Sequence, residues 1–568
     1  MCGIFGYVGN PDRADAIDLD VAIEALRHRG PDGDGKFRAR KGDVAVAMAH
    51  TRLAIIDLSP LAKQPMTTED GRYTLTYNGE VYNFREIRRE LESLGHSFRS
   101  HSDSEVVLKS YVEWGKRCVE HFRGMFVFAI WDETEGALFI ARDRFGIKPF
   151  YYRDAQDGFA FSSEVRALLK TGLADRTLSR EGLETYFTWG SVADPWTLID
   201  GVHSLVPAHR GFWKNGKLEV ERYWDFPEGG TRDISFEEAV EEIRPILRES
   251  IAKELVSDVP LGVFLSGGID SSAIVAIASE VSDRPIHTFT LTFDEAKYNE
   301  AQYAREVAEK FGCIHTEVHL TKEKALGELD AAMASYDQPS ADGINTWFVA
   351  KAAKEAGLSV ALSGLGGDEI FAGYPNFLKF GRLVALSRLA RPFGNLVAPF
   401  FGGASMNGTS MRTKKVGEVL RAEGDPLRVY AGLRCMFTGG QVETLMKEFE
   451  SRSSRVGDRG WGGSSTGATP SNPKFDSRSS KCPVALYSQL ELTNYLRNTL
   501  LRDSDQMSMA HGLEVRVPLL DHLVVEKVLP FAASLKIRNP KSEMRNVNKP
   551  LLAAAAGPLP RAVTHRAK

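Results

Sequence analysis

The second residue of the chain is a cysteine, and its position gives the thiol a chemical option. Cys2 directly follows Met1 in MCGIFGYVGN. Once Met1 is removed, the thiol stands beside a free α-amine. An α-amine has a pKa near ~8 and a thiol near ~8.5, so the amine can accept the thiol proton at neutral pH. A thiol with such a neighbouring base is an activated nucleophile. On Cys2 alone, a small buried residue that starts a strand explains the pattern equally well.

Further motifs in the same part of the chain supply the groups that would hold a bound amino acid. Arg52 opens the apolar run of HTRLAIIDLS, Asn78, Gly79 and Glu80 lie in YNGEVYN, and Asp103 lies in SHSDSEV. Arginine suits an α-carboxylate, and carboxylates suit an α-ammonium group. The Asn78 amide and the Gly79 N–H can stabilise an oxyanion beside a thiol. Taken singly, Asn-Gly is typical of a hairpin turn and Arg52 of a surface cation.

A second group of motifs has the composition of a phosphate site. In FLSGGIDSSA (264–273), an apolar strand is expected to run into Ser-Gly-Gly, and a helix follows. Glycines let the backbone approach a phosphate, and a helix N-terminus offers free N–H groups. Asp270 suits a magnesium ion that bridges phosphates, and Ser271 and Ser272 add hydroxyl groups. The string is not the usual P-loop, and a bare Ser-Gly-Gly is typical of a simple β–α turn.

Three motifs downstream have weaker signals. ALSGLGGDEIFAGY (361–374) repeats the strand-to-glycine pattern with Asp368 and Glu369, which suits either a solvated loop or a nucleotide site. Glu514 and Arg516 in LEVRVPLLD are expected to form a structural ion pair rather than to act as catalytic groups. Taken alone, Lys549 in VNKPLL is typical of a solvated surface lysine.

Composition narrows the function classes. The chain has 568 residues, 26% charged residues and a formal net charge of −4, which argues against a general nucleic-acid or membrane-surface binder. Its five cysteines contain no CxxC pair, so we expect a reducing cytoplasmic setting without a disulfide framework or zinc site. No run of 18 apolar residues and no secretory signal is present, so no membrane span is expected.

The elements that must position these residues fall into two domains. Residues 2–210 read as short strands with intervening helices, which indicates an α+β domain of mostly antiparallel sheets. Residues 236–568 alternate strands with helices, which indicates an α/β domain with a doubly wound parallel sheet. Residues 451–480 are rich in Ser, Gly and Arg, and we expect a disordered insert there.

The N-terminal motifs MCGIFGYVG, RHRGPDGDG, HTRLAIIDLS, YNGEVYNF and the Ser-Asp pair at 102–103 resemble the class II glutamine amidotransferases. The resemblance implies the N-terminal-nucleophile hydrolase sandwich. It also implies that Cys2 attacks the glutamine side-chain amide, giving a glutamyl thioester and ammonia. Glutamine recognition is then implied for Arg52, Asn78, Gly79, Glu80 and Asp103, with Asn78 and Gly79 as the oxyanion hole.

The motifs SGGIDSS, SGLGGDE, SMAHGLEVRVPLLD and NKPLL resemble the ATP-pyrophosphatase half of glutamine-hydrolysing asparagine synthetases. The resemblance implies that aspartate is adenylated by ATP and attacked by ammonia, which arrives through an internal tunnel from the Cys2 site. The products are asparagine, AMP, pyrophosphate and glutamate. Implied ATP or pyrophosphate contacts are Leu265, Ser266, Gly267, Gly268, Asp270, Ser271, Ser272, Leu291, Ser363, Gly364 and Lys549. Mg²⁺ is implied at Asp270 and Asp368, and a homodimer is common in the family.

Two departures keep alternatives open. Leu365 stands where asparagine synthetases commonly carry an acid, which puts the choice of aspartate in question. The chain also stops at Lys568, short of where relatives usually end, so we expect a truncated C-terminus. One alternative is an amidotransferase acting on another carboxylate, such as a cell-wall or polysaccharide precursor. The other is a non-catalytic scaffold that binds glutamine or nucleotide.

Overall fold

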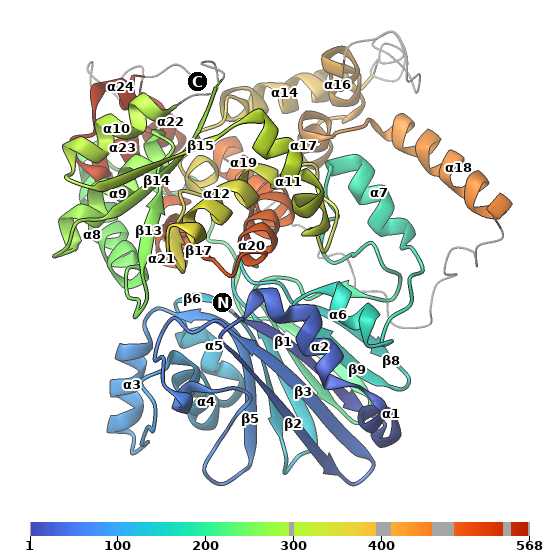
Figure 1. The fold of residues 1–568 in the computed structure, drawn as a ribbon. Helices are drawn as coiled ribbons and strands as arrows, with labels where there is room; N and C mark the ends of the chain where they lie inside the picture. Colours follow the sequence, from blue (N-terminus) through green and yellow to red (C-terminus); the bar gives the residue numbers. More distant parts are fainter. Residues whose placement is uncertain (1, 295–299, 393–410, 457–481, 538–546, 566–568) are drawn as a thin grey trace.

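The computed structural model describes residues 2–294, 300–392, 411–456, 482–537 and 547–565. Figure 1 shows two bodies, with the N-terminal strands in the lower one and the parallel sheet in the upper one. Within the described ranges, no helix is both long and apolar enough to cross a membrane.

The lower body contains two six-stranded antiparallel sheets. The first has the order β10-β8-β9-β1-β3-β2 and the second the order β12-β11-β7-β6-β5-β4. The first sheet consists of β1 (Gly3–Gly9), β2 (Gly33–Lys41), β3 (Val44–Arg52), β8 (Tyr151–Ala155), β9 (Gly158–Ser162) and β10 (His203–Ser204). The second consists of β4 (Met66–Thr67), β5 (Tyr73–Val81), β6 (Gly124–Asp132), β7 (Ala137–Arg142), β11 (His209–Lys214) and β12 (Lys217–Arg222).

The two sheets pack face to face between helices. Successive side chains of a strand point to opposite faces, and in β1 both faces are apolar. Ile4 packs between the sheets with Val127, whereas Phe5 packs toward the helices. The helices on the first sheet are α1 (Pro11–Ala16), α2 (Leu19–Leu26) and α6 (Val165–Lys170); those on the second are α3 (Phe84–Ser93), α4 (Asp103–Trp114) and α5 (Cys118–His121). The predicted antiparallel sandwich is confirmed.

The upper body is built on one parallel sheet with the order β15-β14-β13-β16-β17. Its strands are β13 (Leu261–Phe264), β14 (His287–Phe293), β15 (Ile314–Leu320), β16 (Val360–Leu362) and β17 (Glu514–Arg516). Helices α8 (Phe236–Glu254), α9 (Ile269–Val281), α10 (Ala301–Lys310), α21 (His522–Val528) and α23 (Pro550–Ala556) share one core cluster with the sheet, and α12 (Ile344–Glu355) packs in a separate cluster with Phe289 and Ala361. The predicted doubly wound sheet is also confirmed.

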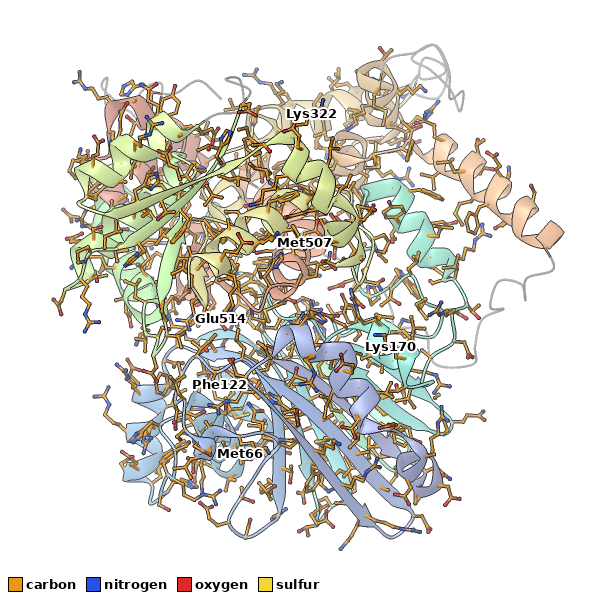
Figure 2. All side chains as sticks on the ribbon, in the orientation of Figure 1. Met66, Phe122, Lys170, Lys322, Met507 and Glu514 are labelled. Atoms are coloured by element: carbon orange, nitrogen blue, oxygen red, sulfur yellow. The ribbon has the colours of Figure 1, made fainter. Side chains whose placement is uncertain are left out.

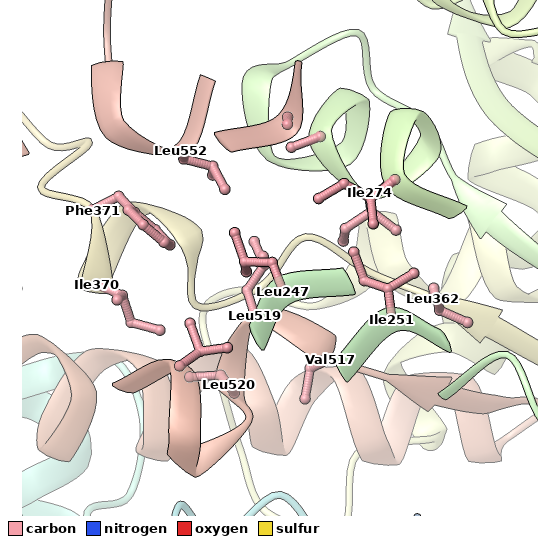
Figure 3. Packing of buried hydrophobic residues seen from close by; sticks show 14 of the residues in the cluster. Leu247, Ile251, Ile274, Leu362, Ile370, Phe371, Val517, Leu519, Leu520 and Leu552 are labelled. Atoms are coloured by element: carbon pink, nitrogen blue, oxygen red, sulfur yellow. The ribbon is translucent and has the colours of Figure 1, made fainter. Parts of the chain in front are cut away.

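The larger of these clusters surrounds the two glycine-rich turns. Figure 3 shows part of it, with Leu247 of α8 beside Leu519, and Ile251 of α8, Ile274 of α9 and Leu362 of β16 in the same cluster. These side chains are almost fully excluded from solvent. Burial of each such side chain contributes about 1.5–3 kcal/mol, so the cluster fixes the strands and helices that flank the glycine-rich turns.

The remaining helices connect and cover the two bodies. They are α7 (Arg180–Trp189), α11 (Lys322–Ala334), α13 (Gly367–Ile370), α14 (Asn376–Ala390), α16 (Met411–Arg421), α17 (Pro426–Arg434), α18 (Gly439–Val456), α19 (Pro483–Glu491), α20 (Arg502–Met509), α22 (Ala533–Ile537) and α24 (Arg561–Thr564), with a π-helical stretch at Leu492–Leu501. Short 3₁₀ turns occur at Arg27–Arg29, Pro60–Ala62, Gly115–Arg117 and Pro518–Leu520.

Two boundaries differ from the sequence expectation. The second sheet continues to Arg222, beyond the expected domain limit at residue 210, because β11 pairs with β7 and β12 pairs with β11. Helix α8 then begins with a capping box that Ser235 and Glu238 form at its N-terminus. Helix α18 extends to Val456, so the first residues of the expected disordered insert at 451–480 are helical; residues 457–480 lie outside the described residues.

Candidate active site

The residues predicted around Cys2 come together at the edge of the first domain. Cys2 precedes β1, Arg52 ends β3, and residues 78–80 lie on β5. Asp103 is the first residue of α4, whose N-cap is the Ser102 hydroxyl. One recess of about 330 Å³ is lined by Cys2, Arg52, Gly79, Glu80 and Asp103, together with further residues of the same loops.

Asn78 is hydrogen-bonded to Cys2 and has one unpaired side-chain donor. The backbone N of Cys2 donates to Asn78 Oδ1 over 2.9 Å. The Nδ2 of Asn78 is buried and has no hydrogen-bond partner. An unpaired buried donor is costly, so its presence beside a thiol fits a site built to bind an oxyanion. The Cys2 thiol itself lies 4.0 Å from the Leu53 carbonyl, and burial raises its pKa.

A glycine is required at position 79 because the backbone there lies very close to the neighbouring strand. A Cβ at this position would lie 2.2 Å from the Met125 carbonyl oxygen. The backbone of β5 therefore runs against β6 at the wall of the recess, next to Asn78. Any larger residue would displace the strand that carries Asn78.

Arg52 is held by backbone carbonyls rather than by a carboxylate. Its guanidinium donates to the carbonyl oxygens of Ser59, over 3.0 Å, and Asp57. Asp57 in turn accepts a 2.7 Å hydrogen bond from the backbone N of His101. A guanidinium fixed by neutral acceptors keeps its full charge for a bound carboxylate.

Glu80 and Asp103 form an acidic wall of the recess that Arg52 also lines. Both are at least nine-tenths buried. Burial raises the pKa of Glu80 well above its usual range, and the nearby Glu514 and Asp103 add to the effect. Burial also raises the pKa of Asp103 to about 6. The hydrogen bonds that its carboxylate accepts from the Tyr77 hydroxyl and the Val81 backbone N act in the opposite direction and lower this pKa. This wall suits a substrate group that brings its own positive charge.

This acidic wall predicts a limb in the pH profile of glutamine use. Below pH 6 the Asp103 carboxyl is protonated, so it loses its attraction for the α-ammonium group of an amino acid. We expect kcat/KM for glutamine to fall about tenfold per pH unit as the pH drops through this value, because kcat/KM reports the free enzyme. Initial rates of glutamate release from pH 5 to 8 measure it, with melting temperatures as the stability control. A flat profile down to pH 5 would contradict the assignment.

The recess also contains polar residues that the sequence did not reveal. Gln64 accepts a 2.7 Å hydrogen bond from the Tyr77 backbone N and donates to Ser104 Oγ over 3.2 Å. Ser102 and Ser104 also line the recess. Gln64 stands in a loop without periodicity, so no signal short of the three-dimensional contacts identifies it.

The second predicted site is the turn between β13 and α9. Gly267 has φ of +67°, and a Cβ there would lie 2.5 Å from Tyr303 Cβ. Ser266 is exposed, and its Oγ lies 3.1 Å from Ser271 Oγ. Ser272 is fully buried in the first turn of α9, and Gly268 is the N-cap residue of that helix. The turn therefore presents backbone N–H groups and hydroxyls at a helix N-terminus, as a phosphate site requires.

Asp270, Asp368 and Lys549 meet beside this turn. The buried Lys549 ammonium donates to Asp270 Oδ2 over 2.5 Å and to Asp368 Oδ1 over 2.6 Å. Burial lowers the pKa of Lys549, but the two carboxylates outweigh it and the pKa is raised. A Cβ at Gly364 would lie 2.8 Å from Asp270 Cβ, so the second glycine turn packs directly on the first. The sequence placed these three residues in separate motifs, and the fold joins them.

The pair of carboxylates fits a magnesium ion held together with phosphates. Mg²⁺ is usually bound by one or two carboxylates plus substrate oxygens rather than by a protein cage. The described part of the chain contains no cluster of three or more His, Cys, Asp or Glu that could hold a metal ion. Asp270 and Asp368 are the residues that would share such an ion.

The other predicted nucleotide contacts lie on or directly after the strands of this sheet. Leu265 directly follows β13, and its backbone N donates to the Phe289 carbonyl over 2.8 Å. Leu291 lies on β14, and Ser363 follows β16. Leu365 is partly buried against the apolar cluster of Figure 3.

One residue contacts the structures around both sites. Arg516 is fully buried and lies 3.6 Å from Glu80 of the first recess. Its own carbonyl accepts a 2.8 Å hydrogen bond from the Ser363 backbone N, at the second glycine turn. It also forms the expected ion pair with Glu514, with 2.6 Å between Nε and Oε1. Figure 2 shows Glu514 at the boundary between the two bodies. The two candidate sites thus face a common interface.

Comparison with known proteins gives the same division of the chain. The model of the glutamine amidotransferase domain matches residues 1–224, and that of asparagine synthase matches residues 242–568. Two relatives from Bacillus subtilis (strain 168) are named asparagine synthetase [glutamine-hydrolyzing] 3 and 1. They are 31% and 32% identical over 100% of this chain and 86% of theirs.

Other similar proteins carry other names. "Amidase chry2" of Gibberella zeae is 28% identical over 98% of this chain and 86% of its own length. A solved glutamine phosphoribosylpyrophosphate amidotransferase from B. subtilis aligns with 64% of this chain and 82% of its own, at 15% identity and a TM-score of 0.30. With both family models matched in order along nearly the whole sequence, the chain belongs to the glutamine-hydrolysing asparagine synthetase family.

Proposed function

We propose that this protein transfers ammonia from glutamine to the side-chain carboxylate of aspartate at the expense of ATP. The products are asparagine, AMP, pyrophosphate and glutamate. The observation that carries the proposal is the pairing of a Cys2 recess with a phosphate-type turn across one interface. The relatives named asparagine synthetase support aspartate as the acceptor.

In the first half-reaction, the Cys2 thiolate attacks the amide carbon of glutamine. Arg52 binds the α-carboxylate, and Glu80 and Asp103 bind the α-ammonium. The orphaned Asn78 Nδ2 and the Gly79 N–H stabilise the oxyanion. Loss of ammonia leaves a glutamyl thioester, which water hydrolyses to glutamate and free thiol. The α-amine of Cys2, released by removal of Met1, is the base that accepts the thiol proton.

In the second half-reaction, the turn at 266–272 and Ser363–Gly364 hold the triphosphate of ATP. The aspartate carboxylate attacks the α-phosphorus, pyrophosphate leaves, and ammonia then displaces AMP from the acyl-adenylate. Lys549 balances charge on the departing pyrophosphate. Asp270 and Asp368 are the residues that would hold a Mg²⁺ ion, which would supply further neutralisation of the phosphate charge.

The test is pyrophosphate release with ATP, Mg²⁺ and glutamine, supplied with a panel of carboxylic acids. Aspartate is expected to give the strongest signal, and omission of the acceptor to give almost none. Leu365 makes the panel necessary, because a leucine cannot contact an acceptor ammonium as a carboxylate would. Silence with aspartate and release with another acid would overturn the acceptor assignment while leaving the ATP chemistry intact.

A further inference from the structure

Arg29 contacts the backbone of the nucleophile itself. It lies in the 3₁₀ turn Arg27–Arg29 of the RHRGPDGDG motif and is fully buried. Its Nε donates to the carbonyl oxygen of Cys2 over 3.2 Å. Because the Cys2 nitrogen is bound to Asn78, the backbone of Cys2 is held on both sides. The direction of the thiol follows from that backbone.

Two carboxylates from different domains orient the Arg29 guanidinium. Glu164, beside α6, accepts from Nη1 over 3.0 Å. Asp505, on α20 of the synthetase domain, lies 2.9 Å from Nη1 and accepts from Nη2 over 3.2 Å. Both carboxylates are at least nine-tenths buried. Burial alone would lower the pKa of Arg29, but Asp505 and Glu164 raise it. Such a two-point arginine–carboxylate contact fixes the plane as well as the charge of the guanidinium.

Resting on the proposed function, we infer that Asp505 is a positioning residue for the glutaminase reaction, although it belongs to the other domain. It acts on Cys2 through Arg29. Asp505 lies on α20, and its neighbour Gln506 contacts a loop of the same domain, since Gln506 Oε1 accepts from the Asp337 backbone N over 3.2 Å. Figure 1 shows α20 on the side of the upper body that faces the first sheet. A change in the position of α20 would therefore alter the support of the nucleophile.

Asp505→Asn tests this inference because it removes the charge while keeping the side-chain size. We expect kcat for glutamine hydrolysis to fall about tenfold or more, since small misplacements of a reacting group are costly. KM for glutamine should change little, because Arg52, Glu80 and Asp103 are untouched. Product formation from added ammonia should stay within about twofold, because that route does not use Cys2. Asp505→Glu, which restores the carboxylate, should recover part of kcat.

Asp503→Asn is the matched control, with the same substitution on the same buried helix but no contact to Arg29. It should leave glutamine kcat within about twofold of the unaltered protein. An unchanged kcat in Asp505→Asn, or an equal loss with ammonia as the nitrogen source, would overturn the inference.

A second readout does not need turnover. The rate at which iodoacetamide alkylates Cys2, followed by peptide mass spectrometry, should rise about threefold or more in Asp505→Asn as the start of β1 loosens. The rate should not rise in Asp503→Asn. An unchanged alkylation rate in Asp505→Asn would also count against the positioning role. If the unaltered protein releases no glutamate from glutamine, the proposed function fails, whereas the alkylation comparison still decides the role of Asp505.

Discussion

Cys2→Ala should abolish the use of glutamine while sparing the use of ammonia. We expect glutamine-dependent product to fall by on the order of 10³-fold or more, because removal of a covalent nucleophile eliminates the thioester route. The recess should still form, since Asn78, Gly79 and Asp103 are held by contacts that do not involve the thiol. With high ammonium at alkaline pH, product formation should stay within about twofold, because the second half-reaction takes ammonia from any source.

Cys313→Ala is the matched control for this substitution. Cys313 is a second free, partly buried thiol, and it lies near Ser279 of α9, away from the recess. It should leave the glutamine-dependent rate within about twofold of the unaltered value. Intact mass measurement should show Met1 absent, as the α-amine base requires. Persistent glutamine-dependent product in Cys2→Ala would show that another group is the nucleophile.

Asp270→Asn should stop pyrophosphate release with either nitrogen source. Asp270 lies where the two glycine turns and Lys549 meet. Its side chain is mostly shielded there, so solvent screens a change in its charge only weakly. Asp270 acts on the phosphates only through the cations that it positions, and loss of one such preorganised electrostatic contact costs about 10²–10³ in rate, so we expect a loss of this size. Glutamine hydrolysis by the Cys2 site should persist, because residues of the first domain line the recess, whereas Asp270 lies on α9 of the second domain. The same substitution should raise the magnesium concentration needed for half-maximal rate.

Asp283→Asn provides the comparison for Asp270→Asn. Asp283 is exposed just beyond the end of α9, whereas Asp270 lies in its first turn. Its loss should leave pyrophosphate release unchanged, which separates the local role of Asp270 from a general change in charge. Normal pyrophosphate release in Asp270→Asn would refute its place in the ATP site.

Motifs in the sequence were sufficient to nominate most of the residues that the fold assembles. Cys2, Arg52, Gly79, Glu80 and Asp103 come from four separate strings, and they line one recess. The parallel and antiparallel sheets were predictable for a related reason, since hydrophobic runs and turn residues report local structure. Such local patterns can be recognised in the sequence without knowledge of tertiary contacts.

Other parts of the site could not be predicted, because they depend on packing between distant segments. Arg29 and Asp505 are 476 residues apart, and neither has a local pattern that names the other. Arg516 was expected to pair with Glu514, but its approach to Glu80 arises only when the two domains dock. Gln64 enters the recess from an irregular loop. Each case requires the three-dimensional interface rather than the periodicity of one segment.

The central claim is that nitrogen moves from glutamine to a carboxylate on this one chain. The most direct measurement uses glutamine labelled with nitrogen-15 in its side-chain amide, together with ATP, Mg²⁺ and aspartate, with no ammonium added. The account predicts asparagine that carries the label, formed in equal amount to pyrophosphate. Glutamate released without labelled asparagine, or pyrophosphate released without transfer of the label, would contradict it.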